Sequence, residues 1–123
     1  MPPVVSSPAQ KKRVLLLGAT GSIGESTLRV LAAQRDRLEL VGIAAHGKHT
    51  RLGEIARQFG VRHVGLYDPA ALAAARSSAA FPTGTRFYGG MTGLSELAAL
   101  PEADIVLVAI VGKTSRGRSH FRI

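Results

Sequence analysis

Residues 18–24 read GATGSIG, and they follow directly on the apolar run RVLLLG of residues 13–18. Three glycines, Gly18, Gly21 and Gly24, recur at a spacing of three where an apolar strand gives way to a helix. A glycine-rich turn of this kind lets the backbone approach phosphate groups closely, and the helix that follows directs its amides toward the anion. The stretch therefore predicts an α/β fold that binds a nucleotide.

Apolar strands alternate with amphipathic helices along the rest of the chain. The predicted strands are residues 13–18, 38–45, 62–67, 85–89 and 103–112. The predicted helices are residues 22–34, 50–59, 70–80 and 94–100. Strands separated by helices favour right-handed βαβ crossovers and a doubly wound parallel sheet. We expect a Rossmann-like domain over residues 13–112, incomplete at its C-terminal end, between a flexible leader (1–12) and an atypical basic tail (113–123).

The sequence also predicts how several helices begin, end and pack. Ser22 and Glu25 have the spacing of a capping box. Asp68 followed by Pro69 is typical of a helix start, and Gly60 of a helix end. The apolar face predicted for the first helix comprises Ile23, Thr27, Val30 and Leu31.

Each part of GATGSIG has a role in a dinucleotide site. Gly18 permits a sharp turn, Gly21 lets the backbone approach a pyrophosphate, and Gly24 lets the helix pack on the strand. The hydroxyls of Thr20 and Ser22 can donate hydrogen bonds to phosphate oxygens. The G-x-x-G-x-x-G spacing is common in enzymes that prefer NADP. The alternative is a strand-to-helix turn that needs glycine for its own geometry and binds nothing.

The end of the second predicted strand indicates which dinucleotide would bind. Enzymes that use NAD place Asp or Glu there to hold the ribose hydroxyls. This chain reads AAHGKHTR over residues 44–51, where Gly47 opens a turn and Lys48, His49 and Arg51 cluster without an acid. Cationic side chains attract the 2′-phosphate of NADP, so the pattern favours NADP over NAD. The alternative is a basic helix start that faces solvent.

Composition excludes several classes of protein. Without cysteine, the chain has no disulfides or thiolate metal sites, which fits a cytoplasmic location. No apolar run is long enough for a membrane span of about 20 residues. The net charge is +8, yet seven of the 16 basic residues lie in residues 11–13 and 113–122, and all eight acids lie between them. The central part is therefore nearly neutral, and we do not expect a nucleic-acid partner.

Three stretches together resemble a known family. LLLGATGSIGESTLRVL, VGIAAHGKH and ADIVLVAIVG are similar to the N-terminal NADPH-binding domain of 1-deoxy-D-xylulose 5-phosphate reductoisomerase, over about residues 13–112. The resemblance implies that Thr20, Gly21, Ser22 and Ile23 contact the cofactor phosphates. It also implies that Gly47, Lys48 and His49 surround the adenosine ribose and its phosphate, although the family usually has Asn where His49 stands.

The resemblance further implies an enzyme of isoprenoid biosynthesis, usually a homodimer. Members rearrange a ketose phosphate held by Mg or Mn and reduce it with NADPH to 2-C-methyl-D-erythritol 4-phosphate. The likeness ends after Gly112, where KTSRGRSHFRI follows. We therefore expect a truncated chain without catalytic or metal-binding residues, one that is inactive alone and would take the sugar phosphate only at full length.

Two other functions stay open at this point. One is a non-catalytic module that binds nucleotides or polyanions through its basic ends. The other is a different GATG-type NADP dehydrogenase, such as a semialdehyde dehydrogenase, whose catalytic cysteine this chain does not contain.

Overall fold

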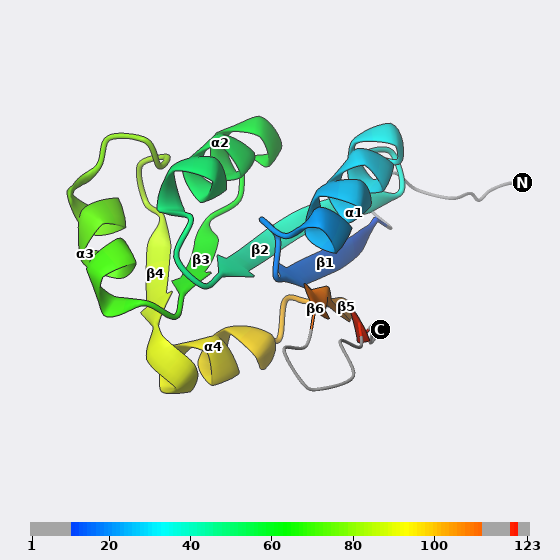
Figure 1. The fold of residues 1–123 in the computed structure, drawn as a ribbon. Coiled ribbons are helices and arrows are strands. Elements are labelled where there is room, and N and C mark those ends of the chain that lie inside the picture. Colours follow the sequence, from blue (N-terminus) through cyan, green and yellow to red (C-terminus); the bar gives the residue numbers. More distant parts are fainter. Residues whose placement is uncertain (1–10, 112–118, 121–123) are drawn as a thin grey trace, which may run out of the picture.

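The computed structural model describes residues 11–111 and 119–120, and its main feature is a five-stranded parallel sheet with the order β4-β3-β2-β1-β5 (Figure 1). The strands are β1 (Lys12–Leu17), β2 (Leu38–Ala45), β3 (His63–Leu66), β4 (Arg86–Gly89) and β5 (Ile105–Val108). The helices are α1 (Ser22–Ala33), α2 (His49–Phe59), α3 (Pro69–Ser77) and α4 (Gly90–Ala98). Each strand pair is parallel, and the predicted α/β fold is confirmed.

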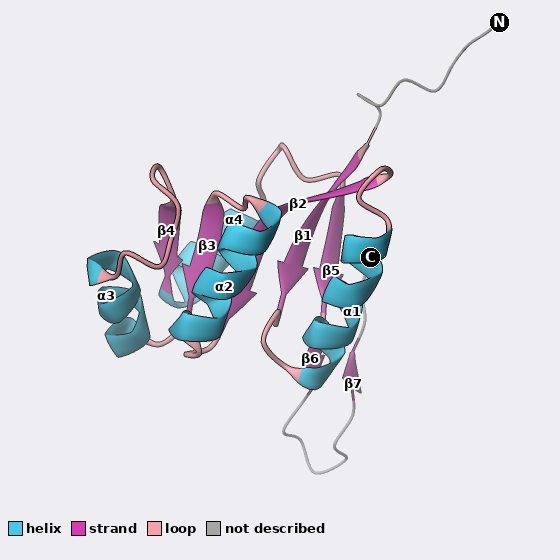
Figure 2. Cartoon of the chain, turned by 90° about the horizontal axis from the view of Figure 1, so that it is seen from above, coloured by secondary structure: helices cyan, strands magenta, loops and turns pink. Residues whose placement is uncertain are grey.

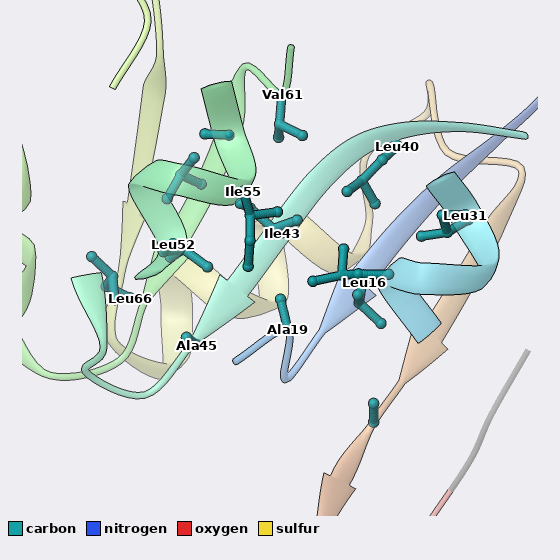
Figure 3. Packing of buried hydrophobic residues seen from close by; sticks show 14 of the residues in the cluster. Leu16, Ala19, Leu31, Leu40, Ile43, Ala45, Leu52, Ile55, Val61 and Leu66 are labelled. Carbon is teal, nitrogen blue, oxygen red and sulfur yellow. The ribbon is translucent and has the colours of Figure 1, made fainter. Parts of the chain in front are cut away.

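Helices cover both faces of this sheet (Figure 2). Side chains alternate along β1, so that Leu16 joins a cluster with α1, α2 and α3, whereas Leu15 packs with Leu97 of α4 on the opposite face. The first cluster includes Leu31, Leu40, Ile43, Leu52 and Ile55, which interlock between the helices and the sheet in Figure 3. Because the strands are buried on both sides, they consist of nearly continuous apolar runs.

The order of the strands reverses next to β1. The chain proceeds from β1 through β2 and β3 to β4, and then crosses back to place β5 on the other side of β1. In doubly wound folds, ligands bind at the carboxyl ends of the strands near such a reversal. The predicted glycine turn follows β1 directly and therefore lies at this edge.

The apolar face predicted for α1 is only partly correct. Leu31 is buried, but Val30 is 57% exposed, and Leu28, which the pattern did not include, is buried. Gly24 sets this orientation, because a Cβ there would lie 2.7 Å from the carbonyl carbon of Ala19. The face of α1 that carries Gly24 therefore lies against the loop, and Leu28 and Leu31 are buried on that side.

The strand predicted over residues 103–112 is wrong in its extent. β5 ends at Val108, and the N–H of Ala109 donates to the carbonyl of Leu17 (2.8 Å). β1 ends at Leu17 because Gly18 turns the chain away with a φ of 84°. Beyond this point β1 offers no further backbone for β5 to pair with.

The chain continues instead into a second, antiparallel sheet. β6 (Ile110–Val111) pairs with β7 (Ser119–His120), which belongs to the predicted basic tail. The other residues of that tail, and residues 1–10 of the predicted leader, lie outside the described residues. No helix in the described part is both long and apolar enough to span a membrane.

The start of α4 also differs from the prediction. This helix begins at Gly90, ahead of the predicted start at residue 94. The prediction missed the first turn because its residues carry little apolar signal. Gly93 lies so close to β4 that a Cβ would approach the carbonyl carbon of Tyr88 to 2.8 Å. Steric fit rather than apolar periodicity thus fixes this end of the helix.

Candidate functional site

The loop after β1 is held by backbone contacts. The N–H groups of Gly18 and Ala19 both donate to the carbonyl of Ala44 at the end of β2, each at 2.9 Å. Gly18 has a positive φ, and Gly24 packs against the loop as described above, so two of the three predicted roles for glycine are confirmed. The loop is therefore rigidly attached to the edge of the sheet.

The third glycine, Gly21, has space on its outer side. It has ordinary dihedrals (φ −80°, ψ 172°), and a Cβ would meet only the carbonyl oxygen of Gly18, at 3.9 Å. Nothing within the described chain therefore requires glycine here. Gly21 and Ser22 are exposed, and Thr20 and Ile23 are half-buried, so the predicted segment faces a surface that a ligand can reach.

The capping box predicted for α1 is wrong. Gly21 is the N-cap, Ser22 is the first helical residue, and no side chain caps the helix. The side chain of Glu25 instead accepts hydrogen bonds from Arg51. The first amides of a helix lack partners within it, so the uncapped start of α1 presents N–H groups and a partial positive charge of about +0.5 to this surface.

The loop after β2 is held beside the end of β3. Asp68 donates its N–H to the carbonyl of His46 (2.8 Å), and the N–H of His49 donates to the carbonyl of Gly47 (2.9 Å). Lys48 is the N-cap of α2, which has neither a side-chain cap nor an acid in its first turn. An open hollow of about 420 Å³ is lined by Lys48, His49, Thr50, Arg51 and Glu54. The start of α2 is therefore a second positive surface.

Arg51 also lines this hollow, but its guanidinium is already paired with carboxylates. Its guanidinium turns toward α1, where Nε and Nη2 donate to the two carboxylate oxygens of Glu25 (2.7 and 2.6 Å). Nη1 donates to Glu54 on its own helix (3.1 Å). The hydrogen bond from Arg51 lowers the pKa of Glu25 below its ordinary value of 4.5, and the charges of Arg29 and Lys48 act in the same direction.

The structure thus brings the two predicted segments together. Both follow adjacent parallel strands at the same edge of the sheet, and the hydrogen bonds from Arg51 to Glu25 join the helices that follow them. Thr20 to Ile23 form one side of this edge, and Gly47 to His49 form the other. The arrangement offers backbone amides on one side and cationic side chains on the other, which suits a ligand with two separate phosphate groups.

An apolar cavity, which the sequence analysis missed, adjoins both segments. It has a volume of about 290 Å³. It is lined by Leu17, Gly18, Ala44, Ala45, His46, Tyr67 and Leu94. The rings of His46 and Tyr67 lie 5.2 Å apart at their centroids. Both residues directly follow strand ends of the sheet, which was the signal available in the sequence, and such a slot suits a flat ring.

The position of Asp68 relative to Gly47 is a second feature that the sequence did not reveal. It caps α3 as predicted, with the N–H of Ala70 donating to Oδ1 (3.4 Å). Its other oxygen, Oδ2, lies 3.6 Å from where a Cβ of Gly47 would be. A carboxylate therefore does lie beside the end of β2, although it comes from the end of β3. It can accept hydrogen bonds from hydroxyl groups near Gly47.

The described residues contain no group of three His, Asp or Glu side chains that could hold a metal ion. His63 lies at the other end of β3, where Nδ1 is 2.9 Å from the hydroxyl of Tyr88 and Nε2 is 3.5 Å from Glu102. That group belongs to the opposite edge of the sheet and not to the surface formed by the two loops.

Comparison with known proteins agrees with this geometry. The family model of 1-deoxy-D-xylulose 5-phosphate reductoisomerase matches residues 14–115. The enzyme of that name from Anaeromyxobacter sp. (strain K) is 45% identical over 101 residues, which is 82% of this chain and 25% of the relative. The one from Mycolicibacterium smegmatis is 44% identical over 103 residues, or 83% of this chain and 24% of the relative.

Solved structures give the same result. The reductoisomerase from Zymomonas mobilis in complex with NADPH has a TM-score of 0.75 and 29% identity, covering 84% of this chain and 27% of its own. A reductoisomerase in complex with NADPH, fosmidomycin and magnesium has a TM-score of 0.74 and 29% identity, covering 82% and 25%. This chain spans about a quarter of the length of the relatives it matches. The match favours the reductoisomerase over another GATG-type dehydrogenase.

Proposed function

The chain belongs to the 1-deoxy-D-xylulose 5-phosphate reductoisomerase family, and from that premise we propose that it binds NADPH as the N-terminal cofactor-binding part of such an enzyme. The observation that carries this proposal is the space at Gly21. The chain itself does not need glycine there, yet a Cβ would project into the surface that a diphosphate must approach. The NADPH complexes of the related structures support the same cofactor.

The diphosphate is proposed to lie against the start of α1. The amides of Ser22 and Ile23 donate to its oxygens, and the hydroxyls of Thr20 and Ser22 add further hydrogen bonds. The N–H of Gly21 donates to the carbonyl of Gly18 (3.4 Å), so the role of Gly21 is to leave room for the diphosphate. The absence of a side-chain cap supports this arrangement, because no described side chain competes for the amides at this helix start.

The 2′-phosphate is proposed to lie against the start of α2. Lys48 supplies a charge and His49 a ring N–H, while Gly47 lets the ribose approach the backbone. Asp68, beside Gly47, is suited to accept a hydrogen bond from a ribose hydroxyl. The apolar cavity next to His46 and Tyr67 is of the right character for the adenine ring.

The activity of the whole family is part of the proposal. Bound NADPH supplies a hydride, and a full-length member reduces the rearranged sugar phosphate to 2-C-methyl-D-erythritol 4-phosphate with the help of Mg or Mn. The residues described here would bind and orient the cofactor, and no step of the reaction is assigned to them. Family membership further leads us to propose a cytoplasmic location and association as a homodimer.

Calorimetric titration of the purified chain with NADPH and NADH tests this function. We expect tighter binding of NADPH, and we expect Lys48→Gln to weaken NADPH binding about tenfold while leaving NADH unchanged, because only NADPH carries the phosphate that Lys48 would bind. Lys12→Gln is the matched control, since Lys12 lies at the opposite end of β1. Equal affinity of the wild-type chain for both cofactors would contradict the proposal.

A further inference from the structure

Arg51 joins the two helices that begin at the proposed cofactor site. Its planar guanidinium makes two parallel hydrogen bonds to the carboxylate of Glu25, 26 residues earlier in the chain. Glu25 lies in the first turn of α1, and Arg51 lies in the first turn of α2. We call this contact the Glu25–Arg51 pair.

The geometry of this pair differs from that of an ordinary surface ion pair, which contributes little to stability. It is bidentate, which fixes both the distance and the relative orientation of the two groups. The side chains are 37% (Arg51) and 30% (Glu25) exposed, so the contact is partly shielded from water. Glu54 holds the guanidinium from its other side, at 3.1 Å.

The position of the pair gives it a role for the site. At the start of the first loop, the N–H groups of Gly18 and Ala19 donate to the carbonyl of Ala44 and fix the loop to β2. Between residues 18–25 and residues 46–51, the hydrogen bonds in the described part of the chain are those from Arg51 to Glu25. Both helices pack on the sheet through one apolar cluster, and the Glu25–Arg51 pair adds the polar link between their starts.

Resting on the proposed function, we infer that Arg51 is a positioning residue for the cofactor: paired with Glu25, it holds the Lys48–His49 segment at a fixed distance from the glycine loop and does not itself bind the 2′-phosphate. Its guanidinium also neutralises the carboxylate of Glu25. Without Arg51, that carboxylate would lose its hydrogen-bonded counter-charge within the first turn of α1, beside the proposed diphosphate, and would repel it.

Direct binding of the 2′-phosphate by Arg51 predicts different behaviour. In that case removal of Arg51 would weaken NADPH and spare NADH, which has no 2′-phosphate. Removal of Glu25 would release Arg51 toward the phosphate and leave NADPH binding unchanged or tighter. Positioning predicts instead that both cofactors weaken together, because both need the glycine loop and the ribose segment in register.

The experiment compares Glu25→Gln, Arg51→Gln and the double variant with the wild-type chain, by calorimetric titration with NADPH and with NADH. We expect each single variant to weaken both cofactors by about five- to tenfold, the effect typical of coupled charged groups in contact. The ratio of the two affinities should stay constant. The double variant should bind no more weakly than Arg51→Gln, because it removes the uncompensated carboxylate as well.

Two further variants separate positioning from general damage. Glu54→Gln is the matched control, because it removes a carboxylate from the same guanidinium without breaking the link between the helices, and we expect less than a twofold change. Arg51→Lys keeps the charge but cannot form both hydrogen bonds, so it should restore only part of the affinity. Thermal unfolding of every variant checks that it is folded.

The outcomes distinguish the inference from the proposed function. A loss confined to NADPH in Arg51→Gln, with Glu25→Gln unchanged or tighter, would overturn the inference, as would wild-type affinities in all variants. In both cases the preference for NADPH and its loss in Lys48→Gln would still support the proposed function. A wild-type chain that binds neither cofactor would overturn the proposed function, and the inference with it.

Discussion

The loops after β1 and after β2 lie side by side, yet different forces hold them. The loop of residues 18–24 is fixed by its backbone: two amides bound to Ala44, a positive φ at Gly18, and a contact at Gly24 that has no room for a side chain. The loop of residues 46–51 has no such steric requirement at its own glycine: the N–H of Asp68 donates to the carbonyl of His46, and the Glu25–Arg51 pair ties the loop to α1. The first loop is therefore sensitive to added atoms, and the second to removed charges.

The largest expected effect tests the steric part of this difference. Gly24→Ala would place a methyl group 2.7 Å from the carbonyl of Ala19, so helix and loop must separate. We expect a loss of unfolding free energy of about 2–3 kcal/mol, as for overpacked cores. Chemical denaturation of the variant and the wild-type chain measures it. An unchanged midpoint would mean that α1 is not held against the loop in solution.

Gly21→Ala separates the space needed by a ligand from the space needed by the fold. The added methyl group meets no described atom closer than 3.9 Å, and its dihedrals suit alanine, so we expect an unchanged unfolding midpoint. NADPH binding should fall about 10- to 100-fold, or about 1.4–2.8 kcal/mol, because the methyl group occupies the approach of the diphosphate. Calorimetry on the same samples measures this, and retained affinity would move the diphosphate away from Gly21.

The contrast between the loops explains how much of the site the sequence could reveal. Glycine spacing reports steric demands that are local in the chain, so the turn at Gly18, the contact at Gly24 and the order of β1 to β5 and α1 to α4 along the chain were predicted correctly. Asp68 and Gly60 were likewise recognised as helix ends, because caps act within a few residues. Local geometry was thus readable from the sequence alone.

Features that depend on residues far apart in the sequence could not be predicted. The capping box failed because α1 begins one residue earlier, with Gly21 as its N-cap, and Glu25 pairs instead with Arg51, 26 residues away. The predicted strand of residues 103–112 was too long because its end is set by where β1 stops. The cavity beside His46 and Tyr67 forms only when two strand ends become neighbours in the sheet. Tertiary contacts decided each of these.

Titration of Glu25 tests the second loop separately, because the pair that ties this loop to α1 is ionic. The pKa of Glu25 in the folded chain lies below its ordinary 4.5, so its contribution to stability is complete above that pH and is lost as the pH falls through the folded pKa. We expect the wild-type chain to be more stable than Glu25→Gln by about 1 kcal/mol or less at pH 7. The difference should vanish at low pH. Thermal unfolding of both chains from pH 7 downward measures it, and a difference that stays constant as the pH falls would assign the stability to packing.

The smallest effect concerns Gly47, the glycine of the second loop. Its φ lies outside the positive range, and a Cβ would make ordinary contacts with Asp68 (3.6 Å) and Ala71 (4.0 Å). Alanine restricts the unfolded chain more than glycine does, so Gly47→Ala should raise the unfolding free energy by about 0.5 kcal/mol. The same substitution would then have opposite signs in the two loops, measured under one set of denaturation conditions. If Gly47→Ala destabilised the chain as strongly as Gly24→Ala, the second loop would also be sterically fixed, and the division between a backbone-held and a charge-held loop would fail.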